Sequence, residues 1–457
     1  MKQLPSFTVW TFLALLTVMS VSAGTRAWYV VACCSNGYLD PEIHVQDRPL
    51  SYENALLVNF AKDYSFMCQA PLAKEEETTA HSAPLYPLLV GLISSRSETP
   101  DWSWRWLQVV LGSLTAVCYF FFARRSFHNT LVATLAGLLA AFHPFWIFNT
   151  GEMNDGVLAS FMLGLALALG ARGAQSGGPL TGLAFGFALA AVALTRAALL
   201  PFAVVALLWF IWECRRHPLG WFAAFLALLG FVNGLAPWAL RNWQAFERPV
   251  PVATSTYLHL WMGNNPRGIV STLDDGTLKP TLSDERWKEL RDEPNQTLRY
   301  NALANDVWQE VKEHPAETLA RRIEAALAFF LGDNWLKSRQ VASMVQPSDT
   351  IAESPDWVRE HAPTILQGAL LAMIALGLLG WRYSHAWRRY GRLCIIAAIF
   401  IPLPYIVSHA EPLHGPRLPL DGVVLCFMAY ALASLVPGLV STPGAAAKQM
   451  QQQQQES

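Results

Sequence analysis

Carboxylates gather in two polar segments that border apolar stretches of this sequence. The first holds Asp40, Glu42, Asp47 and Glu53, and the second, Asn149-Thr-Gly-Glu-Met-Asn-Asp, holds Glu152 and Asp155. A carboxylate at a lipid–water boundary can have a raised pKa and accept a proton from a hydroxyl group. General base catalysis is therefore one interpretation, and a solvated loop charge is the alternative for the first segment. For Asp155 the alternative is a helix N-cap.

Three arginines stand beside apolar stretches elsewhere in the chain. Arg196 separates two apolar runs, Arg241 lies in Pro237-Trp-Ala-Leu-Arg-Asn-Trp, and Arg417 lies in Gly-Pro-Arg-Leu-Pro-Leu. Guanidinium groups match phosphate oxygens in a bidentate fork, and an arginine at membrane depth is costly. Phosphate binding is the functional interpretation of these arginines. A tight outer turn is the alternative for Arg196.

The composition indicates what must position these side chains. Of 457 residues, 53% are hydrophobic and 15% are charged, against about 25% charged in an average soluble domain. Most charged residues fall in the windows 24–103 and 240–362, so the other segments are largely apolar. This pattern predicts a membrane protein with two large water-exposed regions. The net charge of −1 gives no sign of a nucleic-acid partner.

Ten segments approach the length of about 20 apolar residues that a membrane span needs. They are Phe7 to Gly24, Trp104 to Ala123, Leu131 to Phe148, Gly156 to Ala171, Leu180 to Leu194, Ala197 to Trp212, Trp221 to Leu240, Pro363 to Gly380, Leu393 to Ser408 and Leu418 to Leu439. With the N-terminus inside, the basic residues of the short connections fall on the cytoplasmic side. We expect a multi-pass plasma (inner) membrane protein with cytoplasmic termini and an extracytoplasmic site. A cleaved signal peptide is the alternative for the first span.

The spans divide the chain into six parts. They are a first transmembrane helix (1–24), a first outer loop with interfacial helices (25–103), a six-helix transmembrane core (104–240), an extracytoplasmic loop region (241–362), three C-terminal transmembrane helices (363–440) and a disordered cytoplasmic tail (441–457). Residues 83–94 are expected to form a short helix at the outer interface, because about 12 residues cannot span a bilayer.

The second outer region contains a strongly patterned helix that starts at Pro315. Leu319, Ile323, Ala326, Leu327 and Phe330 form one apolar stripe at helical spacing. A helix resting on the membrane surface is the favoured interpretation, with a substrate contact as the alternative.

Cysteine usage predicts one disulfide on the outer side and no metal site. Cys68 has two alternative partners there, Cys33 and Cys34. No CxxC pair or His/Cys cluster suggests zinc. No cofactor is predicted with certainty, and a need for a divalent metal is left open.

The predicted topology brings the acids, the arginines and two more segments, Leu260-Trp-Met-Gly-Asn-Asn-Pro266 and His409 to Arg417, to one face of the membrane. Acids for base catalysis beside cations for a phosphate leaving group suit the transfer of a sugar from a lipid carrier. A secondary transporter is disfavoured, because no predicted span carries a charge clearly at its centre.

The chain resembles bacterial members of glycosyltransferase family 39, which includes protein O-mannosyltransferases and lipid A aminoarabinose transferases with the GT-C membrane fold. The resemblance runs from Arg26 to about Leu432. It rests on Tyr52 to Phe66 with His81 to Leu89, Asn154-Asp-Gly-Val-Leu-Ala-Ser-Phe, Leu194-Thr-Arg-Ala-Ala-Leu-Leu-Pro201, and Pro237 to Pro266. It implies an all-α polytopic bundle of about ten transmembrane helices. It also implies a polyprenyl-phosphate sugar donor and an inverting transfer on the extracytoplasmic face.

The resemblance further implies roles for individual residues. Asp47 matches the catalytic base, with Glu53, Asp40 and Glu42 as substitutes, and Asp155 matches the acid that opens the fourth span. Arg196, Arg241 and Arg417 are expected to compete for the donor phosphate. The expected substrate-binding residues are His81, Tyr86, Glu152, Asn242, Asn264, Asn265 and His414.

The expected partners are the lipid-linked donor, membrane lipids, and an acceptor lipid, glycan or protein. The alternative function is a non-catalytic carrier or flippase for lipid-linked saccharides. A degenerate relative with a structural function only is a third hypothesis.

Overall fold

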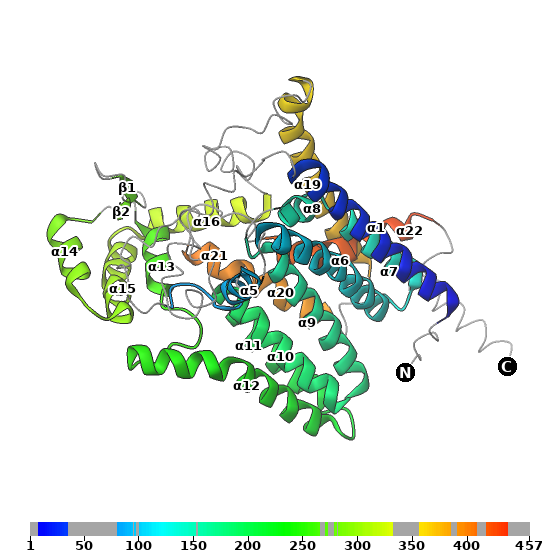
Figure 1. The fold of residues 1–457 in the computed structure, drawn as a ribbon, viewed down its shortest axis with the longest axis horizontal. Helices are drawn as coiled ribbons and strands as arrows, with labels where there is room; N and C mark the ends of the chain where they lie inside the picture. Colours follow the sequence, from blue (N-terminus) through cyan, green and yellow to red (C-terminus); the bar gives the residue numbers. More distant parts are fainter. Residues whose placement is uncertain are drawn as a thin grey trace.

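The structure of this chain is a computed structural model, helical throughout its described residues apart from one hairpin of two short strands (Figure 1). It describes residues 8–34, 80–94, 96, 100–151, 154–265, 270–272, 278–280, 282–331, 356–384, 391–408 and 417–436. The expected fold class, an all-α polytopic membrane protein, is confirmed.

Six helices in the described residues are long and apolar enough to cross a membrane, and a bent pair makes a seventh. They are α1 (Val9–Cys34), α6 (Pro100–Phe127), α9 (Gly156–Ser176), η1 with α11 (Ala197–Leu199 and Leu200–Cys214), α12 (Gly220–Phe246), α20 with α21 (Gly391–Phe400 and Pro402–Ser408), and the bent pair α7 and α8 (Thr130–Ala141 and Pro144–Gly151). Shorter apolar helices occupy the remaining predicted spans, namely α10 (Pro179–Thr195), part of α19 (Asp356–Tyr383), and α22 (Leu418–Ser434).

The third predicted span, Leu131 to Phe148, is broken rather than continuous. Its two halves, α7 and α8, meet at a 45° bend. Pro144 is the first residue of α8, and proline lacks the backbone N–H that an unbroken helix would need there. The predicted span is therefore bent at this position. The break leaves the last carbonyl groups of α7 in need of other donors.

The first predicted span also differs, because α1 continues past Gly24 to Cys34. Arg26 therefore lies inside a helix, where it is fully buried. Its Nη1 and Nη2 donate to the carbonyl oxygens of Ala141 and Ala140, both at 3.2 Å, and Nη1 also donates to the Ser22 hydroxyl at 2.6 Å. The open end of α7 thus solvates the cation. Arg26 was expected just after the first span, and it lies instead within α1, which is longer than the predicted span.

Helix α12 runs beyond the predicted span that ends at Leu240. It continues through Pro237 to Phe246, where Glu247 adopts a left-handed φ of 54° and ends it. Arg241 and Asn242 therefore lie in the last turns of a helix rather than in a loop, which corrects the expected start of the outer region.

Close backbone packing joins α10 to α12. A Cβ atom at Gly186 of α10 would lie 2.0 Å from the carbonyl oxygen of Ala227 in α12, and one at Gly182 would lie 2.3 Å from that of Ala223. Two glycines four residues apart on one helix face allow this approach. They fix the side of α10 that meets α12, which the uniformly apolar sequence leaves undetermined.

The region after α12 contains α13 (Thr256–Asn264), α14 (Asp284–Asp292), α15 (Gln296–Glu313) and α16 (Pro315–Leu331), with antiparallel strands β1 (Val270–Thr272) and β2 (Leu278–Pro280). These elements gather at one side of the bundle (Figure 1). Leu258, Trp261, Tyr300 and Leu303 form a separate apolar core there. The helix predicted from Pro315 is confirmed as α16, and the short helix predicted over 83–94 is confirmed as α5 (Leu85–Ser94).

Candidate active site

Asp155 and Arg196 form a bidentate ion pair where two neighbouring helices meet. Arg196 Nε donates to Asp155 Oδ2 at 2.7 Å, and Nη2 donates to Oδ1 at 2.5 Å. Helix α9 begins directly after Asp155, and α10 ends directly before Arg196. Because α9 and α10 form a hairpin, these ends lie side by side. The side chains of Asp155 and Arg196 are only 11% and 12% exposed, so the pair is nearly removed from water.

Asp155 occupies the N-cap position of α9, but its side chain makes no capping hydrogen bond. Asn154 performs this task instead, because its Oδ1 accepts from the backbone N–H of Gly156 at 2.8 Å. The Asp155 carboxylate is therefore directed to Arg196 and not to the helix end. The backbone of Arg196 lies in the turn between α10 and η1, as one interpretation of the sequence expects. Its side chain, in contrast, pairs with Asp155.

Helix α21 connects this ion pair to the outer region. The Tyr405 side chain hydrogen-bonds to Arg196. On its other side the Tyr405 ring stacks on Phe329 of α16, with 5.9 Å between the ring centroids. Sequence reasoning missed Tyr405, since nothing in the run Pro402-Leu-Pro-Tyr-Ile-Val-Ser singles it out.

The C-terminal ends of α13 and α21 meet beside α16. Asn264 is buried, and its Nδ2 donates to the carbonyl oxygen of Leu260 at 2.7 Å and to that of Val407 at 3.4 Å. Asn265 is the C-cap residue of α13. Asn264 is thus occupied by backbone contacts to α13 and α21, and the predicted role of Asn264 and Asn265 in substrate binding stays a prediction.

Arg322 of α16 holds these helix ends together. It donates to the carbonyl oxygen of Gly263 in α13 and to those of Ile406 and Val407 in α21. A guanidinium group suits this position, because the carbonyl end of a helix carries partial negative charge. The sequence offered only an amphipathic helix at this point, and Arg322 was missed.

Arg417 lies at the start of α22. Its Nε donates to Asp421 Oδ1 at 2.8 Å, and its Nη1 donates to the carbonyl oxygen of Phe330 at the end of α16, at 3.3 Å. The side chain is 13% exposed. Arg417 therefore contacts the C-terminal end of α16, whereas Arg322 lies within α16 and joins it to α13 and α21.

Arg241 occupies a different environment near the end of α12. Its guanidinium carbon lies 4.8 Å from the ring centroid of Trp238, a cation–π contact, and Leu194 packs on the same aromatic cluster. Asn242 is fully buried, accepting from Arg241 Nη1 at 3.0 Å and donating to the carbonyl oxygen of Val250 at 3.0 Å. Asn242 therefore positions Arg241 and anchors the following turn.

His81 and Tyr86 lie in two different apolar surroundings. His81 Nδ1 lies 3.2 Å from the Tyr300 hydroxyl, and its ring centroid lies 5.9 Å from that of His259. Burial lowers the pKa of His81 to about 3, with a further contribution from His259, and burial lowers the pKa of His259 to about 4. Tyr86 packs edge-on against Trp104 at 4.8 Å between centroids. These contacts hold residues 81–86 to α6, α13 and α15.

Several predicted site residues lie outside the described residues. They are Asp40, Glu42, Asp47, Glu53, Glu152 and His414, together with Cys68 of the predicted disulfide. Their roles stay predictions. Within the described ranges, no three His, Cys, Asp or Glu side chains come close enough to hold a metal ion.

One comparison with known proteins bears on the function. Residues 81–238 match the family described as dolichyl-phosphate-mannose-protein mannosyltransferase. The match covers both members of the Asp155–Arg196 pair as well as His81, Tyr86 and Trp238. No curated protein matches the chain. Together with the apolar helices, the similarity over residues 81–238 supports a multi-pass membrane protein with glycosyltransferase activity.

Proposed function

We propose that this protein transfers a sugar from a polyprenyl-phosphate donor to an acceptor hydroxyl on the extracytoplasmic face of the inner membrane, with inversion at the sugar. The acceptor oxygen attacks the anomeric carbon, the bond from that carbon to the phosphate oxygen breaks, and the hydroxyl proton passes to a carboxylate base. The lipid phosphate leaves with the electron pair of the broken bond. Both chain termini are cytoplasmic in this proposal.

The buried Asp155–Arg196 pair carries the proposal. It lies within the segment that matches the mannosyltransferase family, at the ends of apolar helices, and next to a tyrosine hydroxyl. A carboxylate and a guanidinium kept from bulk water in fixed geometry are suited to acting on a polar group that enters from the lipid boundary.

The candidate acids and arginines have different roles in this proposal. Asp47 is the base, with Glu53, Asp40 and Glu42 as its substitutes, and Asp155 orients the acceptor or assists the base. Arg417 and Arg241 are better placed than Arg196 to bind the leaving phosphate, because Asp155 already holds two nitrogens of Arg196. For Arg196 to bind phosphate, the anion must displace one carboxylate oxygen.

Release of free polyprenyl phosphate tests the proposal. The purified protein in nanodiscs is incubated with a panel of polyprenyl-phosphate sugars and acceptor extracts, with and without chelator, and the lipid phosphate is measured by mass spectrometry. We expect release from at least one donor, and loss of release in Asp47→Asn and in Asp155→Asn. Release that is unchanged in Asp47→Asn would overturn the assignment of the base.

A carrier or flippase is the second candidate, and one observation favours it. Broken spans with charged groups at helix ends occur in transporters, and here Arg26 lies fully buried at the break between α7 and α8. A flippase would move labelled lipid between leaflets without releasing lipid phosphate. Movement of every donor without release from any of them would replace the transferase proposal.

A further inference from the structure

Asp421 is a fully buried carboxylate in the first turn of α22. Its Oδ1 accepts from Arg417 Nε at 2.8 Å, and its Oδ2 lies 3.4 Å from His143 Nε2. Taking a carboxylate out of water is costly unless its oxygens have partners. Here Arg417 donates to one oxygen, and the ring of His143 faces the other.

A backbone hydrogen bond orients the ring of His143. His143 lies at the break between α7 and α8, and the backbone N–H of Trp146 donates to its Nδ1 at 3.3 Å. Nδ1 is thus the acceptor, and Nε2 is the ring nitrogen that faces Asp421. His143 is therefore oriented by the backbone of α8, and Arg417 balances the carboxylate charge.

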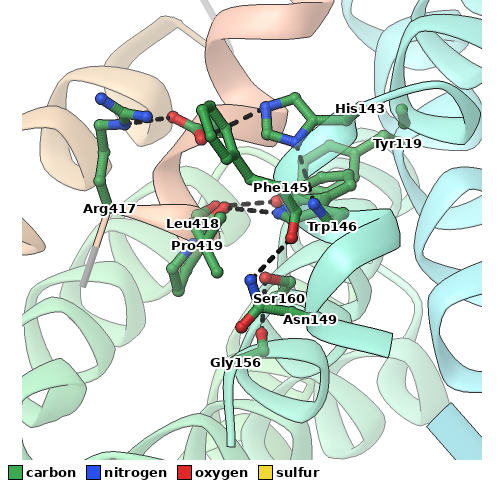
Figure 2. A network of polar contacts seen from close by, with 12 residues as sticks. Tyr119, His143, Phe145, Trp146, Asn149, Gly156, Ser160, Arg417, Leu418 and Pro419 are labelled. Carbon is green, nitrogen blue, oxygen red and sulfur yellow. Dashed lines mark hydrogen bonds and ion pairs between the residues drawn. The ribbon is translucent and has the colours of Figure 1, made fainter. Parts of the chain in front are cut away.

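Two aromatic side chains fix the start of α22. The Tyr119 hydroxyl donates to the Pro419 carbonyl oxygen and Trp146 Nε1 donates to that of Leu418, both at 3.1 Å (Figure 2). The two rings stack with 5.5 Å between centroids. A Cβ atom on Gly422 would lie 2.0 Å from Tyr119 Cζ, so this ring lies directly on the backbone of α22. The first turn of α22 consequently has one fixed position relative to α6 and α8.

This arrangement leaves part of the Arg417 guanidinium for a ligand. Asp421 engages only Nε, and Nη1 makes a longer contact of 3.3 Å to the Phe330 carbonyl oxygen. Among the described residues, no hydrogen bond reaches Nη2 of Arg417. Because Nε is tied to a rigid carboxylate, the two terminal nitrogens point in a fixed direction, as bidentate recognition of a phosphate needs.

We propose that Asp421, supported by His143, is a positioning residue that holds Arg417 for the phosphate of a lipid-linked sugar. The identity of the ligand rests on the proposed function. Fixing the guanidinium before the ligand arrives reduces the side-chain entropy that binding would otherwise cost. Asp421 and His143 act through Arg417 and do not touch the phosphate themselves.

Equilibrium binding of polyprenyl phosphate to the full chain in nanodiscs tests this role, with the polyprenol of equal length as the control for the lipid chain. We expect Arg417→Ala and Asp421→Asn each to weaken phosphate-lipid binding by about tenfold or more. The double variant is expected to be no weaker than either single variant, because the two residues act as one unit. Polyprenol binding stays unchanged. Wild-type affinity in Asp421→Asn, or losses that add in the double variant, would overturn the proposal.

Arg417→Lys keeps the proposal testable where Asp421→Asn does not fold. A lysine has one ammonium group, and pairing with Asp421 leaves it no second donor fork for phosphate, so we expect a loss as large as that of Arg417→Ala. Near wild-type affinity in Arg417→Lys would overturn the proposal. Since binding needs no turnover, phosphate binding that depends on Asp421 without any sugar transfer by the wild-type protein would contradict the proposed function alone.

Discussion

Asp155 and Arg196 are joined by two hydrogen bonds across 41 residues of sequence, and neither side chain is more than 12% exposed. Each charge depends on the other, since neither has full access to water. Arg196 also donates a hydrogen bond to the hydroxyl oxygen of Tyr405 in α21. A change at either residue will therefore alter both the local structure and the electrostatic field at the site.

Asp155→Asn should lower both activity and stability. Breaking a buried ion pair from one side costs about 3 kcal/mol or more, because the remaining charge is left unpaired. We expect a lower apparent melting temperature and a loss of polyprenyl phosphate release of about a hundredfold. Thermal unfolding and the release assay measure the two effects.

The exchanged double variant Asp155→Arg with Arg196→Asp separates these effects. It restores an ion pair, so part of the lost stability should return, while release stays low because the charges have changed places. Arg216→Gln is the matched control, because Arg216 pairs with Glu213 at 3.2 Å but is 47% exposed. Full activity in the exchanged variant would show that the pair is only structural.

Arg322→Gln should loosen α16 from its neighbours. Arg322 donates to carbonyl oxygens of α13 and α21, and hydrogen bonds from a charged donor contribute about 1.5–3 kcal/mol. We expect faster proteolytic cleavage around α16 and reduced release of lipid phosphate. Lys288→Gln, on an exposed position of α14, is the control. Equal cleavage rates in both variants would contradict the role of Arg322.

Much of the fold follows from the sequence, because apolar runs of sufficient length can form little but helices in lipid. The bend before Pro144 was also readable, since proline cannot continue a helix. The site was less predictable. The contacts Asp155–Arg196 and His143–Asp421 depend on which helices pack together, and residue spacing along the chain carries no such information. Arg26 was expected just after the first span instead of inside a helix. Its partners are backbone carbonyl groups, which every residue carries, so the residue types give no sign of them.

Stability should fall in mild acid through His81 and His259. Burial lowers the pKa of both residues to about 3 and about 4, below the value of about 6.5 in the unfolded chain. Above pH 6.5 both states are neutral at these residues. Below it the unfolded state binds protons first, so each histidine destabilises the fold by about 1.4 kcal/mol per pH unit until its folded pKa is reached.

Melting temperatures between pH 7.5 and pH 5 measure this effect. His81→Asn and His259→Leu should each flatten the decline, because an uncharged side chain has no proton to bind. His314→Gln, a change at an exposed histidine with 47% of its side chain accessible, is the control. A decline that is equally steep in all variants would assign acid sensitivity to other groups.

The apolar stripe of α16 should contact lipid. Leu319, Ile323 and Leu327 are 61%, 52% and 53% exposed, whereas Ala325 and Phe329 on the neighbouring face are buried against the protein. The stripe that the sequence predicted is thus not used for internal packing. A helix with one face held by protein and another apolar face exposed is suited to lie in the membrane surface.

Spin labels on single cysteines introduced into α16 test this placement. A label at Leu327 should be relaxed more by dissolved oxygen, which concentrates in lipid, than by a water-soluble nickel chelate. A label at Glu317, which is 65% exposed on the same helix, should show the reverse. Both labels responding mainly to the nickel chelate would place α16 away from the bilayer. That result would favour the alternative interpretation, in which the stripe contacts a substrate.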